Sequence, residues 1–125
     1  MISASDAMID SRINPGIVVP FQMTSKLFNP DQIKSSGAFL NGGRHGEFIW
    51  YFDTGAIECH CFFKNGESYG EYVYYAINGC VLEHSFRSTN GTRIDELVYL
   101  VNEPRDEAFY VTLALYGIDK EYTIG

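Results

Sequence analysis

Basic residues are scarce in this chain of 125 residues, where 9 Lys and Arg stand against 16 Asp and Glu, and the formal net charge is −7. Nucleic-acid phosphates and anionic membranes attract basic surfaces, so this balance argues against direct binding to either. The acidity is also uneven, because residues 1–35 are neutral, residues 36–70 carry −2 and residues 71–125 carry −5. A protein partner with a basic surface is the better electrostatic match.

Cysteine is also scarce, and long hydrophobic runs are absent from the sequence. The three cysteines are Cys59, Cys61 and Cys80, and an odd number without regular spacing does not fit a secreted disulfide scaffold. No apolar run approaches the roughly 20 residues that a membrane-spanning helix needs. The start of the chain has neither the basic residues nor the apolar core of a signal peptide. We therefore expect a cytoplasmic protein without a membrane span.

Proline is limited to four residues and long polar tracts are missing, so the composition does not fit a disordered protein. Aromatic residues are plentiful instead, with nine Tyr, nine Phe and one Trp making up 15% of the chain. Such residues favour β-strands. The length predicts one domain.

A repeat with a period of about 24 residues is the strongest pattern in the sequence. Residues 46–51, GEFIWY, return at 70–75 as GEYVYY and more weakly at 95–100 as DELVYL. Asn-Gly pairs recur alongside them, at 41–42, 65–66 and 90–91. A period of this length predicts one small unit stacked several times. Asn-Gly is typical of tight β-hairpin turns, so the unit is predicted to be a hairpin.

Turn residues divide the repeats into six predicted strands, near 46–52, 57–63, 71–76, 81–87, 94–101 and 107–116. Short connections force neighbouring strands to be antiparallel. We therefore predict an all-β fold, an antiparallel β-meander of stacked hairpins over residues 38–125. Residues 1–37 are predicted to form a short N-terminal extension with helical turns near 5–10 and 29–33. Pro20 confines the apolar run at 17–21 to an edge or an irregular segment.

Alternation along the predicted strands assigns two faces to the sheet. One face is aromatic or apolar and is expected to be buried: Phe48, Trp50, Phe52, Tyr72, Tyr74, Leu97 and Tyr99. The other is mixed and begins with an acid in each copy: Glu47, Ile49, Tyr51, Glu71, Val73, Tyr75, Glu96, Val98 and Leu100. A single sheet needs a cover for its apolar face. The N-terminal segment, curling of the sheet and a second chain are the candidates, and the last would make a homo-oligomer.

The repeat positions together resemble the MORN repeat, and more closely the MORN-repeat variant of a bacterial antitoxin-like family. The matching positions are Gly46, Trp50-Tyr51, Gly55, Phe62-Phe63, Asn65-Gly66, Gly70, Tyr74-Tyr75, Gly79, Phe86 and Asn90-Gly91. The resemblance covers about residues 38–100 and departs from the family at Asp95, which replaces an expected glycine. It implies an array of β-hairpins used for protein interaction, with toxin neutralisation as one option.

Two histidines, His60 and His84, stand 24 residues apart at equivalent positions of the repeat. If the hairpin register pairs residue 52 with residue 57, they fall on the face of the acids, which predicts stacked Glu47/His60 and Glu71/His84 pairs about 10 Å apart. A histidine beside a carboxylate can act as an acid or base, or respond to pH. A polar stripe on a solvated or interface face has the same pattern, and we favour that interpretation.

The run Cys59-His60-Cys61 contains residue types that bind metals, but a strand directs its two cysteines to one face and its histidine to the other. We therefore predict no metal site and expect both thiols to pack among the aromatic rings. Cys80, in a predicted turn, is the one candidate nucleophile, and the sequence offers it no base. We accordingly predict no catalytic residues and no cofactor.

These patterns together predict a non-enzymatic protein-binding module that acts through an acidic and aromatic sheet face. Its function would be that of an inhibitor, either antitoxin-like or a phage-type protein directed against a host or defence protein. The expected partner-binding residues share one face: Glu47, Tyr51, His60, Glu71, Tyr75, His84 and Glu96. The alternative is a small ligand-binding or hydrolytic domain built on the Glu/His pairs, which requires a concave pocket with convergent polar groups.

Overall fold

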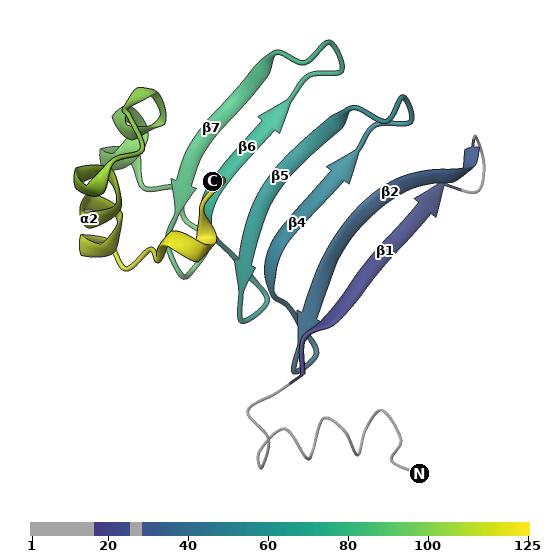
Figure 1. Ribbon diagram of the computed structural model, residues 1–125, viewed down its shortest axis with the longest axis horizontal. Helices are drawn as coiled ribbons and strands as arrows, with labels where there is room; N and C mark the ends of the chain where they lie inside the picture. The colour runs from purple at the N-terminus through teal and green to yellow at the C-terminus, as the bar shows by residue number, and fades with distance from the viewer. Residues whose placement is uncertain (1–16, 26–28) are drawn as a thin grey trace.

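The computed structural model describes residues 17–25 and 29–125, and its main feature is one antiparallel sheet (Figure 1). The strands are Val19–Ser25 (β1), Asn29–Leu40 (β2), Gly43–Arg44 (β3), Gly46–Tyr51 (β4), Ile57–Lys64 (β5), Glu67–Tyr75 (β6) and Val81–Arg87 (β7). Their order in the sheet is β1-β2-β4-β5-β6-β7, and the short β3 pairs with β2. The predicted all-β antiparallel meander is confirmed.

The Asn-Gly turns at 41–42 and 65–66 explain why hairpins form where the repeat predicts them. The two asparagines have φ angles of 53° and 54°, and the two glycines have φ angles of 82° and 83°. Two successive residues with positive φ make the type I′ turn, whose twist matches that of antiparallel strands. The repeat therefore sets the positions of the hairpins through local backbone preference.

The third copy of the repeat does not form a strand, and the strands predicted at 94–101 and 107–116 are wrong. Asp95–Asn102 is a 3-10 helix (η1), Glu107–Leu115 is an α-helix (α2), and Lys120–Tyr122 is a second 3-10 helix (η2). Asp95 stands where the first two copies have a glycine with positive φ, a conformation that costs an L-residue about 1–2 kcal/mol. Leu97 and Leu100 are both buried, and their spacing fits the 3-10 period.

Helix α2 begins at a capping residue that the strand prediction overlooked. The Asp106 carboxylate accepts a hydrogen bond from the backbone N–H of Phe109, with 3.0 Å between the two heavy atoms. Such a cap satisfies one of the free N–H groups at a helix start. Phe109 and Leu113, four residues apart, are both buried. Most of the other residues in this segment are also apolar, so the spacing of Phe109 and Leu113 did not distinguish a helix from a strand in the sequence.

The N-terminal third contributes two strands to the sheet, so the predicted boundary at 37/38 falls inside β2. The helical turn predicted near 29–33 is wrong, because β2 begins at Asn29 and pairs with both β1 and β4. Pairing of Asn29 and Ile33 with β1 overrides the local helix-start signal. The strand β1 is an edge strand, as Pro20 requires. The helical turn predicted near 5–10 lies outside the described residues.

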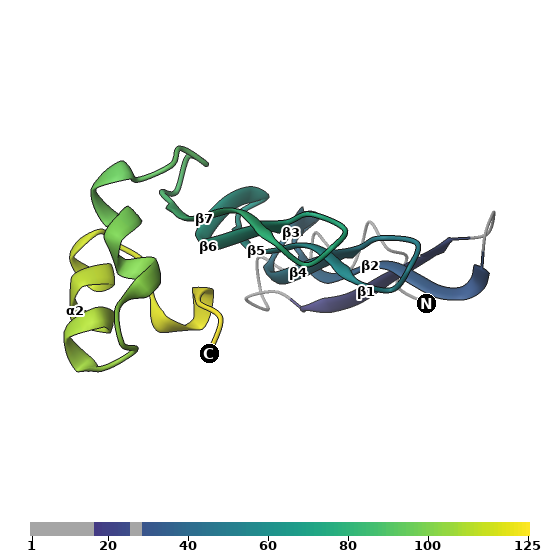
Figure 2. The ribbon, with the colours of Figure 1, turned by 90° about the horizontal axis from the view of Figure 1, so that it is seen from above.

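The C-terminal segment, residues 95–125, packs on the mixed face of the sheet, whereas a cover was expected on the aromatic face. Viewed edge-on, the strands form a single layer with α2 beyond the β7 edge (Figure 2). The segment then turns back, so that η2 lies across β6 (Figure 1). The main core forms at this junction from Phe62, Tyr69, Phe86, Leu97, Leu100, Phe109, Leu113, Ile118 and Tyr122.

The expected division into a buried aromatic face and an open mixed face is therefore only partly right. The main core lies on the mixed face, and the aromatic face buries a smaller cluster of Phe48, Cys59, Cys61 and Phe63. The Arg44 guanidinium lies 5.3–5.7 Å from the centroids of three aromatic rings of that cluster and its surroundings. Tyr74 and Tyr99, which were expected in the core, are exposed.

Gly70 and Gly46 provide a matched test of how the C-terminal segment packs on the sheet. Both have positive φ, but a Cβ at Gly70 would lie 2.4 Å from the Tyr122 carbonyl oxygen, whereas one at Gly46 would meet nothing within 4 Å. Gly46→Ala is expected to lose about 1–2 kcal/mol of unfolding free energy from backbone strain. Gly70→Ala adds a main-chain clash and is expected to lose about 1–3 kcal/mol more. Urea denaturation measures both, and equal losses would contradict this contact.

Candidate functional site

Both predicted Glu/His pairs form. The Nε2 atom of His60 lies 2.7 Å from Oε2 of Glu47, and Nε2 of His84 lies 2.5 Å from Oε2 of Glu71. The register that produces them is as predicted, because His60 stands opposite Ile49 and His84 stands opposite Val73. The prediction placed residue 52 opposite residue 57, but a register shift after residue 50 places residue 51 there. The shift lies beyond the Glu47/His60 pair and does not disturb it.

The two pairs share the same construction. The His60 ring lies 5.7 Å from the Phe62 ring at an interplanar angle of 26°, and the His84 ring lies 6.3 Å from the Phe86 ring at 34°. Both phenylalanines are buried in the main core. Each histidine is therefore held between a buried ring and a carboxylate.

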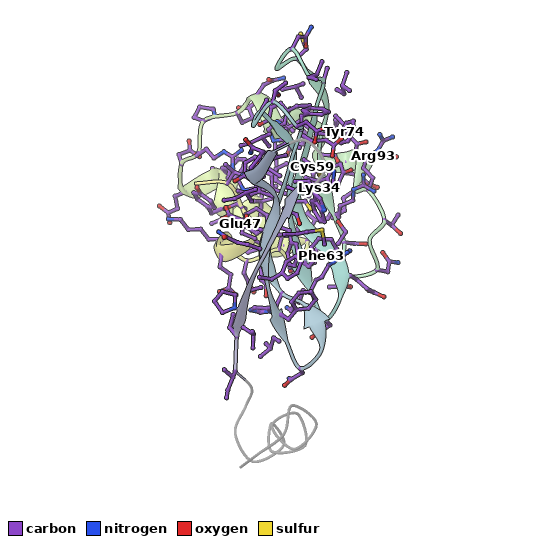
Figure 3. All side chains as sticks on the ribbon, turned by 90° about the vertical axis from the view of Figure 1, so that its right-hand side faces the viewer. Lys34, Glu47, Cys59, Phe63, Tyr74 and Arg93 are labelled. Carbon is purple, nitrogen blue, oxygen red and sulfur yellow. The ribbon has the colours of Figure 1, made fainter. Side chains whose placement is uncertain are left out.

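The two pairs differ in their surroundings. The Glu71 side chain is fully buried beneath the C-terminal segment, whereas the Glu47 side chain is 55% exposed. Figure 3 shows Glu47 on the side of the sheet where the C-terminal segment lies, with Cys59 and Phe63 on the opposite side. Equivalent positions of the repeat thus provide one internal and one external carboxylate.

Glu71 binds the protein's own C-terminal segment. The Arg105 guanidinium donates from Nη1 to Oε1 at 2.7 Å and from Nη2 to Oε2 at 2.5 Å. The backbone N–H of Ile124 donates to Oε1 at 2.8 Å, and the Ile124 carbonyl accepts from Arg105 Nη1 at 3.0 Å. Each carboxylate oxygen of Glu71 accepts two hydrogen bonds, Oε1 from Arg105 and the Ile124 N–H, and Oε2 from Arg105 and His84. The carboxylate therefore ties both ends of the helical segment to β6.

The pKa of Glu71 reflects two opposing effects. Burial raises the pKa of this carboxyl group, but hydrogen bonds from Arg105, His84 and the Ile124 N–H, with the positive charge of Arg105, lower it to about 2. The same hydrogen bond raises the pKa of Arg105. The ion pair is therefore fully charged at neutral pH.

The remaining predicted partner-binding residues are spread over different environments. Tyr51 and Tyr75 are partly buried at the ends of β4 and β6. Glu96 was expected to continue the face from a third strand, but it lies in η1 with its side chain exposed. Of the two Glu/His pairs, Glu47/His60 is the one whose carboxylate is exposed.

A shallow groove of about 700 Å³ adjoins Glu47 on the N-terminal strands. Its lining includes Val18, Pro20, Ala38 and Gly46, together with Glu47 itself, but not His60. Gln22, Ser36 and His45 also line it, so the groove is mixed in character. The groove thus contains an imidazole, from His45, as well as the carboxylate, but among the described residues no hydrogen bond joins the two as an acid and base pair requires.

The cysteines lie away from the Glu/His pairs. Cys59 and Cys61 are buried on the aromatic face as predicted, and the hydrogen bond with Cys59 and burial raise the pKa of Cys61. Cys80 is exposed in a turn. Across residues 17–25 and 29–125, no group of three or more His, Cys, Asp and Glu side chains is placed to bind a metal ion.

Sequence reasoning missed the residues that hold Glu71. Arg105 lies 34 residues beyond it and Ile124 lies 53 residues beyond it, so no local pattern links them. The one available signal is that Arg105 is a rare base in the strongly acidic C-terminal half. Gly70 was assigned only to a turn, although its lack of a side chain also admits Tyr122.

Removing Arg105 is expected to destabilise the fold because it would leave a buried carboxylate without its counter-ion. We expect Arg105→Met to lose about 3–5 kcal/mol of unfolding free energy. Arg93→Met is the matched control, since Arg93 pairs with Asp95 at the exposed surface and should lose less than about 1 kcal/mol. Urea denaturation compares them, and similar losses would show that the buried pair contributes little.

Glu71 is also expected to make stability depend on pH. Its pKa of about 2 in the folded state lies below the ordinary value of 4.5, so its stabilisation is complete above about pH 4.5 and is lost as the pH falls through 2. The loss amounts to roughly 3 kcal/mol. Denaturation at several pH values should show a smaller loss on acidification for Glu71→Gln than for wild type. Glu47→Gln serves as the control and should keep the wild-type dependence.

In the described part of the chain, no helix has both the length and the apolar character that crossing a lipid bilayer requires. The resemblance of residues 38–100 to the MORN repeat stays a prediction. Comparison with protein-family models, with characterised proteins and with solved structures found no match to this chain.

Proposed function

We propose that this protein is a non-enzymatic protein-binding module whose contact surface is the open part of the Glu/His face, with Glu47, Tyr51 and His60 as its centre. The observation that supports this proposal is that the same face already binds a polypeptide segment. The second repeat binds the C-terminal segment through Glu71, while the equivalent carboxylate of the first repeat, Glu47, remains accessible. A partner segment can therefore use contacts of the same kind at Glu47.

The charge of the chain favours a basic partner. The net charge of −7 attracts a positively charged protein surface and speeds encounter with it. A small acidic binder of this kind fits an inhibitor, either antitoxin-like or a phage-type protein that blocks a host or defence protein. The exposed residues Ile17, Val18, Val19 and Met23 on and before the edge strand β1 offer a place for self-association.

A small ligand-binding or hydrolytic domain is the second candidate, because Glu47 and His60 form a hydrogen-bonded acid and base pair. Its support is weaker, since the groove beside Glu47 includes His45 but not His60, and among the described residues no hydrogen bond joins His45 to Glu47. Ionic strength separates the two functions. Binding of a basic protein should weaken with added salt, whereas an apolar ligand in the groove should be little affected.

The test is affinity capture from native cells with wild type and with Glu47→Ala/Tyr51→Ala as baits. We expect wild type to retain one stoichiometric protein and the variant to retain about tenfold less, because aromatic and charged side chains at the centre of an interface dominate its energy. The matched control is Tyr99→Ala/Glu103→Ala, which removes an exposed tyrosine and an exposed acid elsewhere. Circular dichroism confirms that each variant is folded. No specific protein on wild type, or equal loss with the control, would count against the proposal.

A further inference from the structure

The C-terminal segment reveals what a Glu/His pair of this protein selects. At Glu71 the ligand is the guanidinium of Arg105, bound through two nitrogen atoms to the two carboxylate oxygens at 2.7 and 2.5 Å. A guanidinium fork matches a carboxylate in this bidentate way, and a lysine ammonium does not. The backbone N–H of Ile124, 19 residues further along the chain, adds a third hydrogen bond to this carboxylate.

We propose that Glu47 and His60 form a second receptor of the same type, which binds an arginine side chain on an extended segment of a basic partner protein. This inference rests on the proposed function and names the class of partner. The receptor is formed by Gly46, Glu47 and His60, with Phe62 beneath the histidine.

The argument begins with the equivalence of the two sites. Gly46 and Gly70 precede the two glutamates and have φ angles of 74° and 86°. At Gly70 the space above the glycine is filled by the main chain of Tyr122, whereas above Gly46 nothing lies within 4 Å of an ideal Cβ. The first repeat therefore keeps open the place that the C-terminal main chain occupies in the second.

Glu47 also has unused capacity to accept hydrogen bonds. Its Oε2 atom contacts His60, and its Oε1 atom has no hydrogen-bond partner among the described residues. His60 is 13% exposed and stacked on Phe62, so the pair is held in position before a ligand arrives. Pre-organised acceptors reduce the entropic cost of binding.

The groove beside Glu47 can hold the rest of the segment. It runs over Val18, Pro20 and Ala38 on the N-terminal strands and ends at Gly46 and Glu47. Because Gln22, Ser36 and His45 also line it, the groove suits both apolar and polar side chains next to the arginine. A partner segment would thus place its arginine on the carboxylate and its neighbours over β1 and β2.

A different protein fits this site better than a second copy of the same chain. Each arginine in residues 17–25 and 29–125 already has an intramolecular partner, an aromatic cluster for Arg44 and a carboxylate for Arg87, Arg93 and Arg105. The net charge of −7 makes a second copy a weaker electrostatic match for Glu47. The excess of acid attracts a basic protein for the same reason.

The experiment is an NMR titration of isotope-labelled full-length protein with a blocked hexapeptide that carries one arginine flanked by glycine and tyrosine. We expect saturable shifts of the His60 ring and Glu47 carboxyl signals, with a dissociation constant on the order of 1 mM for one isolated site. Peptides with lysine or citrulline in place of arginine should bind at least about fivefold more weakly. Glu47→Gln should weaken binding about tenfold, because a charge-assisted bidentate contact is lost.

Glu58→Gln is the matched control, since it removes one carboxylate from the neighbouring strand β5 without touching the pair. It should leave the arginine response unchanged. The inference is overturned by a lack of saturable shifts up to about 10 mM peptide, by an equal response to the citrulline peptide, or by an unchanged response in Glu47→Gln. Concentration-dependent broadening of the His60 signals without peptide would assign the site to a second copy and also overturn it.

The titration and the affinity capture fail independently. A captured partner that depends on Glu47 and Tyr51, with no arginine-selective shift, would reject this inference and leave the proposed function standing. Arginine-selective binding that Glu47→Gln abolishes would support the receptor even if no protein is captured, and that result would count against the proposed function alone.

Discussion

The buried carboxylate of Glu71 is the interaction on which the arrangement of the sheet and the C-terminal segment depends. Removing a carboxylate and a guanidinium from water costs several kcal/mol per ion. That cost is offset here because Arg105, His84 and the Ile124 N–H all donate to the same carboxylate. Arg105 precedes α2 and Ile124 follows η2, so one side chain anchors both ends of the part of the segment that contains α2 and η2.

The anchor sets the position of the main core. With its two ends held on β6, the segment places Phe109, Leu113 and Tyr122 against the sheet residues Phe62 and Phe86. Each fully buried side chain of this size contributes about 1.5–3 kcal/mol. The ion pair and the core therefore depend on each other, because the core excludes water from the pair and the pair aligns the core.

The repeat gives the two Glu/His pairs the same local geometry. The pairs differ in burial, because the C-terminal segment that follows β7 covers the carboxylate of Glu71 and leaves that of Glu47 exposed. Glu71 is consequently a structural residue, and Glu47 is left as a carboxylate held by His60 on an accessible surface. Internal duplication can in this way produce a structural site and a binding site from one motif.

Local preferences alone determined the hairpins, because Asn-Gly turns have the backbone geometry that a tight antiparallel turn needs. They also determined the register, and with it the Glu47/His60 pair and the shared face of Cys59 and Cys61, since strand alternation has a fixed period of two. Only the tertiary structure decided that the third copy is helical and that Glu71 is buried. The first outcome depends on the burial of Leu97 and Leu100 in the main core, and the second on Arg105 and Ile124, which lie far from Glu71 in the chain.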